Sequence, residues 1–391
     1  MAECNSLVNN SNNLNIIMAA DIQANLSRDV VQEEALAIAT KNKRCGLGIS
    51  MGVGKTRIAI RHMILNFDPF IQYLIVVPKN TVKESWIQEF RKMEADEMLN
   101  HVTFVTYLSI NKKHPGDYDI VYLDECHSLL PSHEAFLSMF DGKILGLTGT
   151  PPRDKQSIKG RLVQKYCPIK YTFDVDSATD SRILNDYKII VHELELSKLP
   201  TLKKKNKNTG GVWYTNEAKD YQYYNGRIAD AQSQKQIQLA RIMRMRALME
   251  YTTKENYVSS MIKNINDKCI IFANTQDQAD RMATHSYHSN NPKSEENLEL
   301  FSDGRINTLS CVLQLSEGVT IPNLKQGIIM HAYGNERKTA QRIGRLLRLN
   351  PAETATCHIL CYKGTQDEYW VKQALKGFDQ EKIINYNPLK Q

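Results

Sequence analysis

The strongest constraint on the fold is an alternation of short apolar runs with amphipathic stretches, which occurs twice along the 391 residues. Buried strands separated by helices are typical of parallel sheets in α/β proteins. The expected strands of the first half are Tyr73–Pro78, Val102–Tyr107, Asp119–Asp124 and Ile144–Gly149. Those of the second half are Tyr187–Leu196, Lys268–Asn274, Thr308–Leu313, Gly327–Ala332 and Thr356–Tyr362. We therefore expect two α/β halves, with a largely helical segment over residues 197–265.

The composition is that of an ordinary globular protein with a moderately basic charge. Hydrophobic residues make up 42% of the chain and charged residues 24%, as in ordinary globular proteins. The net charge of +7 permits a polyanionic partner such as nucleic acid. The eight cysteines form no C-x-x-C pair, which fits free thiols in a reducing compartment. The asparagine-rich extension over residues 1–25 lacks the features of a signal peptide, and no apolar run is long enough for a bilayer, so we expect a cytoplasmic location.

A glycine-rich segment, GLGISMGVGKT, runs from Gly46 to Thr56 between an expected strand and an expected helix. Glycines let the backbone turn tightly and direct its N–H groups toward phosphate oxygens at a helix N-terminus. In such a loop Lys55 reaches the β- and γ-phosphates, and the Thr56 hydroxyl binds Mg²⁺. Ile49 replaces one glycine of the strict pattern, but the M-G-x-G-K-T run still predicts a phosphate site.

Two carboxylates complete that site. Asp124 and Glu125 end the apolar strand in IVYLDECH. One carboxylate at a strand end holds Mg²⁺ through water, and a second accepts a proton from the attacking water. Together with Lys55 and Thr56, they predict a nucleoside triphosphate hydrolysis site.

Two basic segments leave alternatives open. Residues 335–351 predict a helix that ends at Pro351 and carries Arg342, Arg345 and Arg348 along one face. In isolation such a helix is more often a solvated basic face than a phosphate contact. The lysine-rich stretch Lys198–Gly211 similarly favours a solvated loop over a phosphate-binding segment.

The motifs and their order resemble those of superfamily 2 helicases and translocases of the DExH type. The matching segments, in chain order, are Gln32 for the adenine-reading glutamine, GVGKT for motif I, VVPKNTVKESWIQEF for Ia, VTYLS for Ib, DECH for II, LTGTPP for III, CIIFANTQDQAD for IV, QLSEGVTIPNL for V and QRIGRLLR for VI.

The resemblance implies two tandem RecA-like domains with parallel sheets and an ATP cleft between them. The first domain would span residues 26–180 and the second residues 181–391. The implied cofactors are ATP and Mg²⁺. The implied catalytic residues are Lys55, Asp124, Glu125, Gln341, Arg345 and Arg348. The implied nucleotide-binding residues are Gln32, Gly52, Gly54, Lys55, Thr56 and His127, and the metal-binding residues are Thr56 and Asp124. The implied nucleic-acid contacts are Lys79, Thr106, Asn274 and Ser316.

The resemblance favours a compact, phage- or virus-like DNA helicase that separates strands or moves branches in replication, recombination or repair. Its expected partners are single-stranded, forked or branched DNA and single-strand-binding or recombination proteins, with no membrane. The alternatives are a duplex-DNA translocase that leaves strands paired, and an RNA helicase. A nucleic-acid sensor with an inactive ATPase belongs to a different class, and the intact motif residues argue against it.

Overall fold

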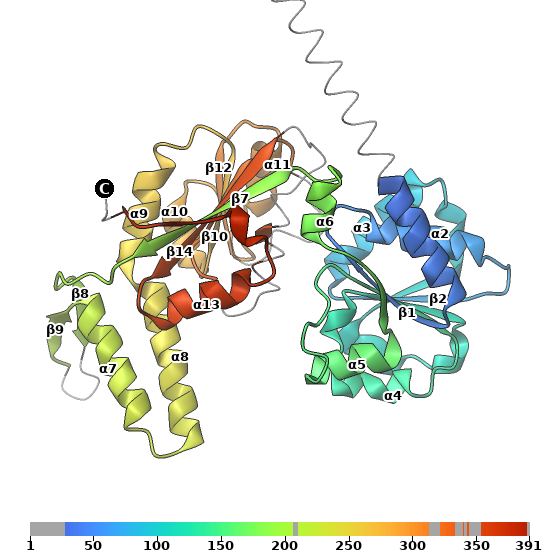
Figure 1. Ribbon diagram of the computed structural model, residues 1–391, viewed down its shortest axis with the longest axis horizontal. Coiled ribbons are helices and arrows are strands. Elements are labelled where there is room, and N and C mark those ends of the chain that lie inside the picture. The colour runs from blue at the N-terminus through green and yellow to red at the C-terminus, as the bar shows by residue number, and fades with distance from the viewer. Residues whose placement is uncertain are drawn as a thin grey trace, which may run out of the picture. The chain divides into compact units, whose positions relative to one another are not determined.

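The computed structural model describes residues 28–205, 210–312, 321–332, 339, 342–343 and 353–388. It divides the chain into two compact units (Figure 1). The first unit contains the described residues up to Tyr187, and the second contains most of those from Lys188 onward. Each unit has its own sheet and its own hydrophobic core.

The first unit is built on a six-stranded parallel sheet in the order β3-β2-β4-β5-β1-β6. Its strands are β1 (Arg44–Ile49), β2 (Tyr73–Val77), β3 (Val102–Thr106), β4 (Ile120–Asp124), β5 (Lys143–Thr148) and β6 (Ile169–Phe173). The register places Gly48 beside Thr148 and Asp124 beside Leu147. The loops that follow β1, β4 and β5 therefore begin at one edge of the sheet, where ligands of parallel sheets bind.

Helices pack around this sheet because each presents an apolar stripe. In α3, Val82, Trp86 and Phe90 are buried at a spacing of four residues, which places them on one face. The helices are residues 28–41, α2 (Lys55–Leu65), α3 (Asn80–Lys92), α4 (Glu134–Leu137), α5 (Ile158–Tyr166) and α6 (Val175–Asp180). Short 3-10 helices are η1 (Asp96–His101), η2 (Tyr107–Lys112), η3 (Pro115–Asp117), η4 (Cys126–Ser128) and η5 (Pro131–His133).

The second unit contains a seven-stranded sheet in the order β11-β12-β10-β13-β14-β7-β15. Its strands are β7 (Asp186–Leu194), β10 (Cys269–Ala273), β11 (Ser286–Tyr287), β12 (Thr308–Val312), β13 (Gln326–Ile329), β14 (Thr354–Tyr362) and β15 (Ile383–Tyr386). The helices that accompany it are α9 (Thr252–Ile262), α10 (Gln276–Met282), α11 (Ser294–Ser302) and α13 (Gln366–Leu375), with η6 (Gln380–Lys382) before β15.

An appendage joins β7 to α9 in the second unit. It consists of the antiparallel strands β8 (Leu202–Lys205) and β9 (Val212–Thr215), followed by the helices α7 (Glu217–Ala229) and α8 (Gln234–Glu250). The two helices run side by side beside the sheet (Figure 1).

The expected fold class, two α/β units with parallel sheets, is confirmed. The expectation of a solvated loop over Lys198–Gly211 is wrong at Leu202–Lys205, which forms β8. The reason is its partner β9, whose sequence VWYT is rich in residues that favour strands. A bilayer-spanning helix is absent from the described residues, since every helix there is too short or too polar.

Candidate active site

The glycine-rich loop leaves β1 and enters α2 at the edge where β4 and β5 end. The N–H group of Ser50 donates to the Phe173 carbonyl at 2.7 Å, which ties the start of the loop to β6. Gly52 has φ +88° and Gly54 has φ +106°. Both values lie in the left-handed region that glycine adopts without strain. Gly54 is the N-cap of α2, so the first N–H groups of that helix are available to an anion.

Gln32 fastens this loop from the helix over residues 28–41. The side chain is only 2% exposed, and its Nε2 donates to the Val53 carbonyl at 2.7 Å. A Cβ at Gly54 would lie 2.5 Å from the same nitrogen, so a larger residue there would displace Gln32. Within the described part of the chain, the buried Gln32 Oε1 accepts no hydrogen bond. This acceptor fits a ligand that offers an amino donor, as adenine does.

Asp124 is the last residue of β4 and is 8% exposed. Its Oδ2 accepts a hydrogen bond from Trp86 Nε1 at 2.9 Å. Its backbone carbonyl accepts from the Tyr107 hydroxyl at 2.8 Å. The carboxylate is therefore oriented by a side chain of α3 and its backbone by a side chain of η2.

Glu125 turns the chain out of β4 with φ +51° and ψ +54°. This conformation brings its Oε2 to 3.2 Å from His127 Nδ1 and to 3.3 Å from Thr148 Oγ1. His127 Nδ1 and Thr148 Oγ1 lie 2.8 Å apart, and the Thr150 N–H group donates to Thr148 Oγ1 at 3.1 Å. Residues of the DECH and LTGTPP segments thus form one polar network.

The network keeps the Glu125 carboxylate ionised. Burial raises the pKa of Glu125, but the His127 hydrogen bond, the charges of Lys55 and His127, and the Thr148 hydrogen bond together lower that pKa to about 2. An ionised carboxylate beside a phosphate site is able to accept a proton from water.

Lys55 completes the site from the first turn of α2. A Cβ at Gly149 would lie 3.3 Å from Lys55 Nζ, so the ammonium group lies against the backbone that follows β5. Thr56 and Asp124 carry side-chain oxygens of the kind that Mg²⁺ prefers as ligands. Among the described residues, no group of three or more acidic, histidine or cysteine side chains could enclose a metal. Such a site fits Mg²⁺ that binds one or two protein oxygens together with nucleotide phosphates.

The expected nucleic-acid contacts fall in different places. Lys79 is exposed where α3 begins after β2, and Thr106 ends the neighbouring β3 at the same sheet edge. Asn274 follows β10, and its Nδ2 donates to Met249 Sδ at 2.9 Å, so that amide is engaged within the second unit. Ser316 lies outside the described residues.

The arginine segment is described only in part. Gln341, Arg345 and Arg348 lie outside the described residues. Arg342 is described, and it is 5% exposed. Its Nη1 donates to the His331 carbonyl at 2.9 Å, and its guanidinium group lies 5.5 Å from the centre of the Phe272 ring. These contacts assign Arg342 to the core of the second unit and not to a solvated face.

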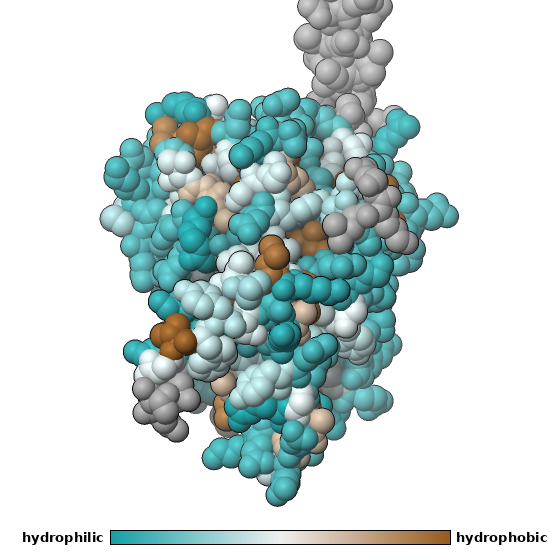
Figure 2. All heavy atoms as spheres, turned by 90° about the vertical axis from the view of Figure 1, so that its left-hand side faces the viewer, coloured by the Kyte–Doolittle hydropathy of each residue, from teal (hydrophilic) through white to brown (hydrophobic). Residues whose placement is uncertain are grey.

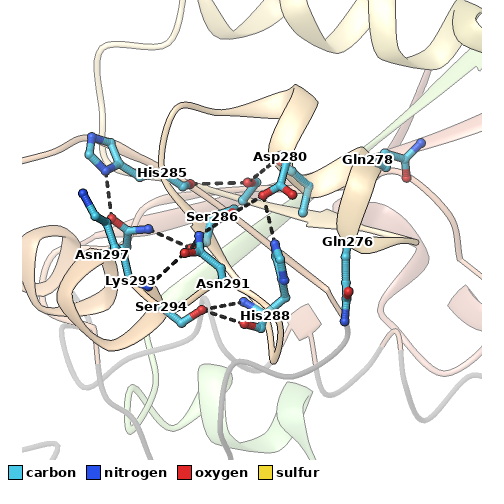
Figure 3. Close-up of polar contacts among 12 residues, drawn as sticks. Gln276, Gln278, Asp280, His285, Ser286, His288, Asn291, Lys293, Ser294 and Asn297 are labelled. Atoms are coloured by element: carbon cyan, nitrogen blue, oxygen red, sulfur yellow. Dashed lines mark hydrogen bonds and ion pairs between the residues drawn. The ribbon is translucent and has the colours of Figure 1, made fainter.

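A separate polar cluster lies between α10, β11 and α11 (Figure 3). Asp280 Oδ1 accepts from both Ser286 Oγ at 2.5 Å and His288 Nε2 at 2.9 Å. Asn291 and Asn297 donate to the Ser286 carbonyl. Because serine and histidine both donate to the same aspartate, the histidine is not placed as a base toward the serine. The cluster instead secures the edge strand β11.

Two family descriptions match the chain. Residues 16–153 match the type III restriction enzyme res subunit, and residues 253–350 match the helicase conserved C-terminal domain. A relative described as "DNA 3'-5' translocase XPB2", from Sulfurisphaera tokodaii, is 26% identical over 369 residues, which cover 86% of this chain and 82% of the relative.

Solved structures share the fold. The type ISP restriction-modification enzyme LlaBIII bound to DNA aligns with a TM-score of 0.59 and 15% identity, covering 92% of this chain and 31% of that chain. The Hef helicase domain of Pyrococcus furiosus aligns with a TM-score of 0.50 and 14% identity, covering 88% of this chain and 97% of that chain. At these identities the likeness concerns the fold, which is that of tandem RecA-like units.

Proposed function

The chain belongs to helicase superfamily 2 as an ATP-hydrolysing helicase or translocase, and on that premise we propose that it couples ATP hydrolysis to movement along DNA. We further propose that this movement separates strands or moves branches during replication, recombination or repair. DNA is favoured because the relative from Sulfurisphaera tokodaii is described as a DNA translocase. Its described 3'-5' direction is the direction that we propose here.

The observation that carries the proposal is the polar network at Glu125. An ionised carboxylate lies within hydrogen-bond distance of His127 and Thr148, and the Lys55 charge contributes to that ionisation. Glu125 would accept a proton from the attacking water, and Lys55 would hold the terminal phosphates. His127 and Thr148 would keep the carboxylate oriented while water binds beside it. A sensor with a degenerate site would have no need to preserve these contacts.

Mg²⁺ would be held by Thr56 and Asp124. When bound, the ion would neutralise charge on the phosphate oxygens. The contribution of this chain is to aim the Asp124 carboxylate, which the Trp86 indole fixes by a 2.9 Å hydrogen bond. Gln341, Arg345 and Arg348 remain proposed as further catalytic residues, with Arg345 and Arg348 as arginine fingers.

A second candidate is a duplex-DNA translocase that leaves the strands paired. The relative favours it, since its description names a translocase and not a helicase. Both candidates share the ATP site, so they differ only in what the motion does to DNA.

One set of assays separates these functions. ATP turnover and strand separation would be measured on single-stranded DNA, duplexes, forks, four-way junctions and RNA. Stimulation by DNA with separated forks or moved junctions supports the helicase. Stimulation by duplex without strand separation supports the translocase, and stimulation by RNA alone supports an RNA helicase. A lack of stimulation by every nucleic acid would exclude a motor.

A further inference from the structure

The appendage of the second unit contains a stretch of unusual charge. Between Lys198 and Thr215 the sequence has five lysines and no acidic residue. Its described strands, β8 and β9, form what we call the lysine–aromatic hairpin, residues 202–205 and 212–215. The side of the second unit that carries this hairpin and α7 and α8 is largely hydrophilic, with isolated apolar patches (Figure 2).

The register of the hairpin sorts its side chains onto two faces. Lys203 pairs with Tyr214, Lys204 with Trp213, and Lys205 with Val212. Opposite residues share a face, and successive residues alternate between faces. Lys203, Lys205, Val212 and Tyr214 therefore occupy one face, and Lys204 and Trp213 occupy the other.

The face with Lys204 attaches the hairpin to the rest of the unit. Lys204 Nζ forms an ion pair with Asp220 Oδ2 at 2.9 Å and lies 5.9 Å from the centre of the Tyr224 ring. Asp220 Oδ2 also accepts from the Tyr251 hydroxyl at 3.1 Å. A two-stranded ribbon is marginally stable by itself. The contacts of Lys204 stabilise the hairpin against α7, so this lysine has a structural role.

The opposite face has no such role. Lys203 and Lys205 are exposed, and neither forms an ion pair with any residue that the structure describes. On the same face, Tyr214 pairs with Lys203 and is 62% exposed, whereas Trp213, 50% exposed, lies on the face with Lys204. On α7, the exposed Tyr223 ring lies 5.4 Å from the Tyr224 ring, which itself neighbours Lys204 on the attached face.

Single-stranded nucleic acid has the chemistry that suits this surface. Lysines neutralise its phosphates, and unpaired bases stack on exposed aromatic rings. A duplex presents phosphates but no open base faces in its stacked interior. Resting on the proposed function, we propose that the outer face of the lysine–aromatic hairpin binds single-stranded DNA, with Lys203 and Lys205 on phosphates and Tyr214 under a base.

The test measures how tightly a fluorescein-labelled oligothymidylate binds to the full chain. Binding is monitored by fluorescence anisotropy at a series of salt concentrations. The variants are Lys203→Gln with Lys205→Gln, and Tyr214→Ala. Removing two phosphate contacts should reduce the slope of log affinity against log salt by about 1.4. Removing one stacking ring should weaken binding on the order of tenfold. Tyr214→Phe keeps the ring and should bind as the wild type does.

Matched controls remove two lysines and one tyrosine that lie outside the hairpin. Lys41→Gln with Lys376→Gln removes two exposed lysines, and Tyr369→Ala removes an exposed tyrosine of α13. ATP turnover without nucleic acid should be unchanged in every variant, which also shows that each protein is folded.

The outcomes distinguish a failure of this inference from a failure of the proposed function. Hairpin variants that bind oligothymidylate as tightly as the wild type, or lose no more than the controls, overturn the inference. A loss of affinity confined to duplex DNA or to oligouridylate, measured in the same way, also overturns the inference. If the wild-type ATPase responds to no nucleic acid, the proposed function fails, whereas a stimulated wild type with unaffected hairpin variants removes the inference alone.

Discussion

Glu125 is the residue where backbone conformation and chemistry depend on each other most directly. Its left-handed conformation costs about 1–3 kcal/mol in a residue other than glycine. The contacts with His127 and Thr148 offset that cost and hold the carboxylate at the strand end. Backbone strain at this position is therefore coupled to the orientation of the proposed base.

Glu125→Gln should preserve ATP binding and reduce ATP turnover by about a hundred- to ten-thousandfold, because an amide accepts no proton from water. Turnover would be measured alongside binding of a fluorescent ATP analogue. Glu84→Gln, at an exposed position of α3, is the control. A Glu125→Gln enzyme with wild-type turnover would remove this residue from the proposed role.

The arginine segment should divide into a structural and a catalytic part. Arg342→Ala removes a hydrogen bond and a ring contact from the core, so it should lower the free energy of unfolding by about 1–3 kcal/mol. Arg345→Ala should leave stability unchanged and reduce ATP turnover on the order of a thousandfold.

Urea unfolding and ATPase assays on both variants check this division. The opposite pattern, with Arg345→Ala unstable and Arg342→Ala inactive but stable, would reverse the assignment.

The residues that sequence analysis identified are those whose chemistry is carried by a local motif. Lys55, Asp124 and Glu125 could be read from short segments. The contact between Trp86 and Asp124 could not, since it joins α3 to the end of β4 over 38 residues of sequence. The core position of Arg342 was also hidden, because helical spacing alone does not distinguish a solvated face from one buried against Phe272.

At the scale of elements, buried polar contacts join strands and helices of the second unit. Lys254 on α9 is fully buried, and its Nζ contacts Asp367 Oδ2 at 2.6 Å. The same nitrogen donates to the carbonyls of Met330 at 2.8 Å and Leu360 at 3.1 Å. The three ammonium protons are thus satisfied by α13 and by the segments at β13 and β14.

Removing one partner of this pair should destabilise the second unit strongly. Asp367→Asn leaves a buried ammonium group without its counter-charge and should lower the free energy of unfolding by about 3–5 kcal/mol. The double variant Lys254→Met with Asp367→Leu should lose less than Asp367→Asn alone. Urea unfolding of the two proteins checks the order, and equal losses would contradict it.

A histidine pair links β7 to β14 and predicts an acid-sensitive fold. His192 Nε2 lies 2.9 Å from His358 Nδ1, and His192 Nδ1 lies 2.8 Å from the Tyr257 hydroxyl. Burial, with a smaller repulsion from His358, lowers the pKa of His192 to about 4. Burial, with a smaller effect of Lys188, lowers the pKa of His358 to about 4.

Unfolded histidines bind protons near pH 6.5, so the unfolded state takes up more protons as the pH falls from about 6.5 to about 4. The free energy of unfolding should therefore decrease through that window, by at most about 3 kcal/mol per histidine. His192→Gln with His358→Gln should reduce the dependence and leave the part due to His62, whose pKa burial also lowers to about 4. His114→Gln, at an exposed histidine, should leave the dependence unchanged, and a double variant with the wild-type slope would contradict the assignment.

Most central strands could be predicted because buried parallel strands appear as continuous apolar runs. The edge strands β6, β11 and β15 were not among the expectations, since an edge strand is short and its residues are only partly apolar. The β8–β9 pairing was missed for a related reason. A run of lysines has neither the alternating nor the continuous apolar pattern of a strand. The strand β8 can therefore be recognised only together with its partner β9.

At the scale of the whole molecule, the two units have separate sheets and cores, so calorimetric unfolding should show more than one transition. The described residues that we propose to bind nucleotide all belong to the first unit. A non-hydrolysable ATP analogue at about a hundredfold excess over its Kd should therefore stabilise the transition of that unit by about 2.7 kcal/mol. Lys55→Ala should abolish the shift. A shift that persists in this variant would place nucleotide binding elsewhere.

The hydrogen bond between Trp86 and Asp124 gives the molecule an intrinsic optical probe. The sequence has three tryptophans, and Trp86 is the one in the first unit. Its indole donates to the carboxylate proposed to hold Mg²⁺, so a change of charge at that carboxylate would alter the ring's emission. With Trp213→Phe and Trp370→Phe, stopped-flow fluorescence would follow nucleotide arrival and product departure in real time, without any attached dye.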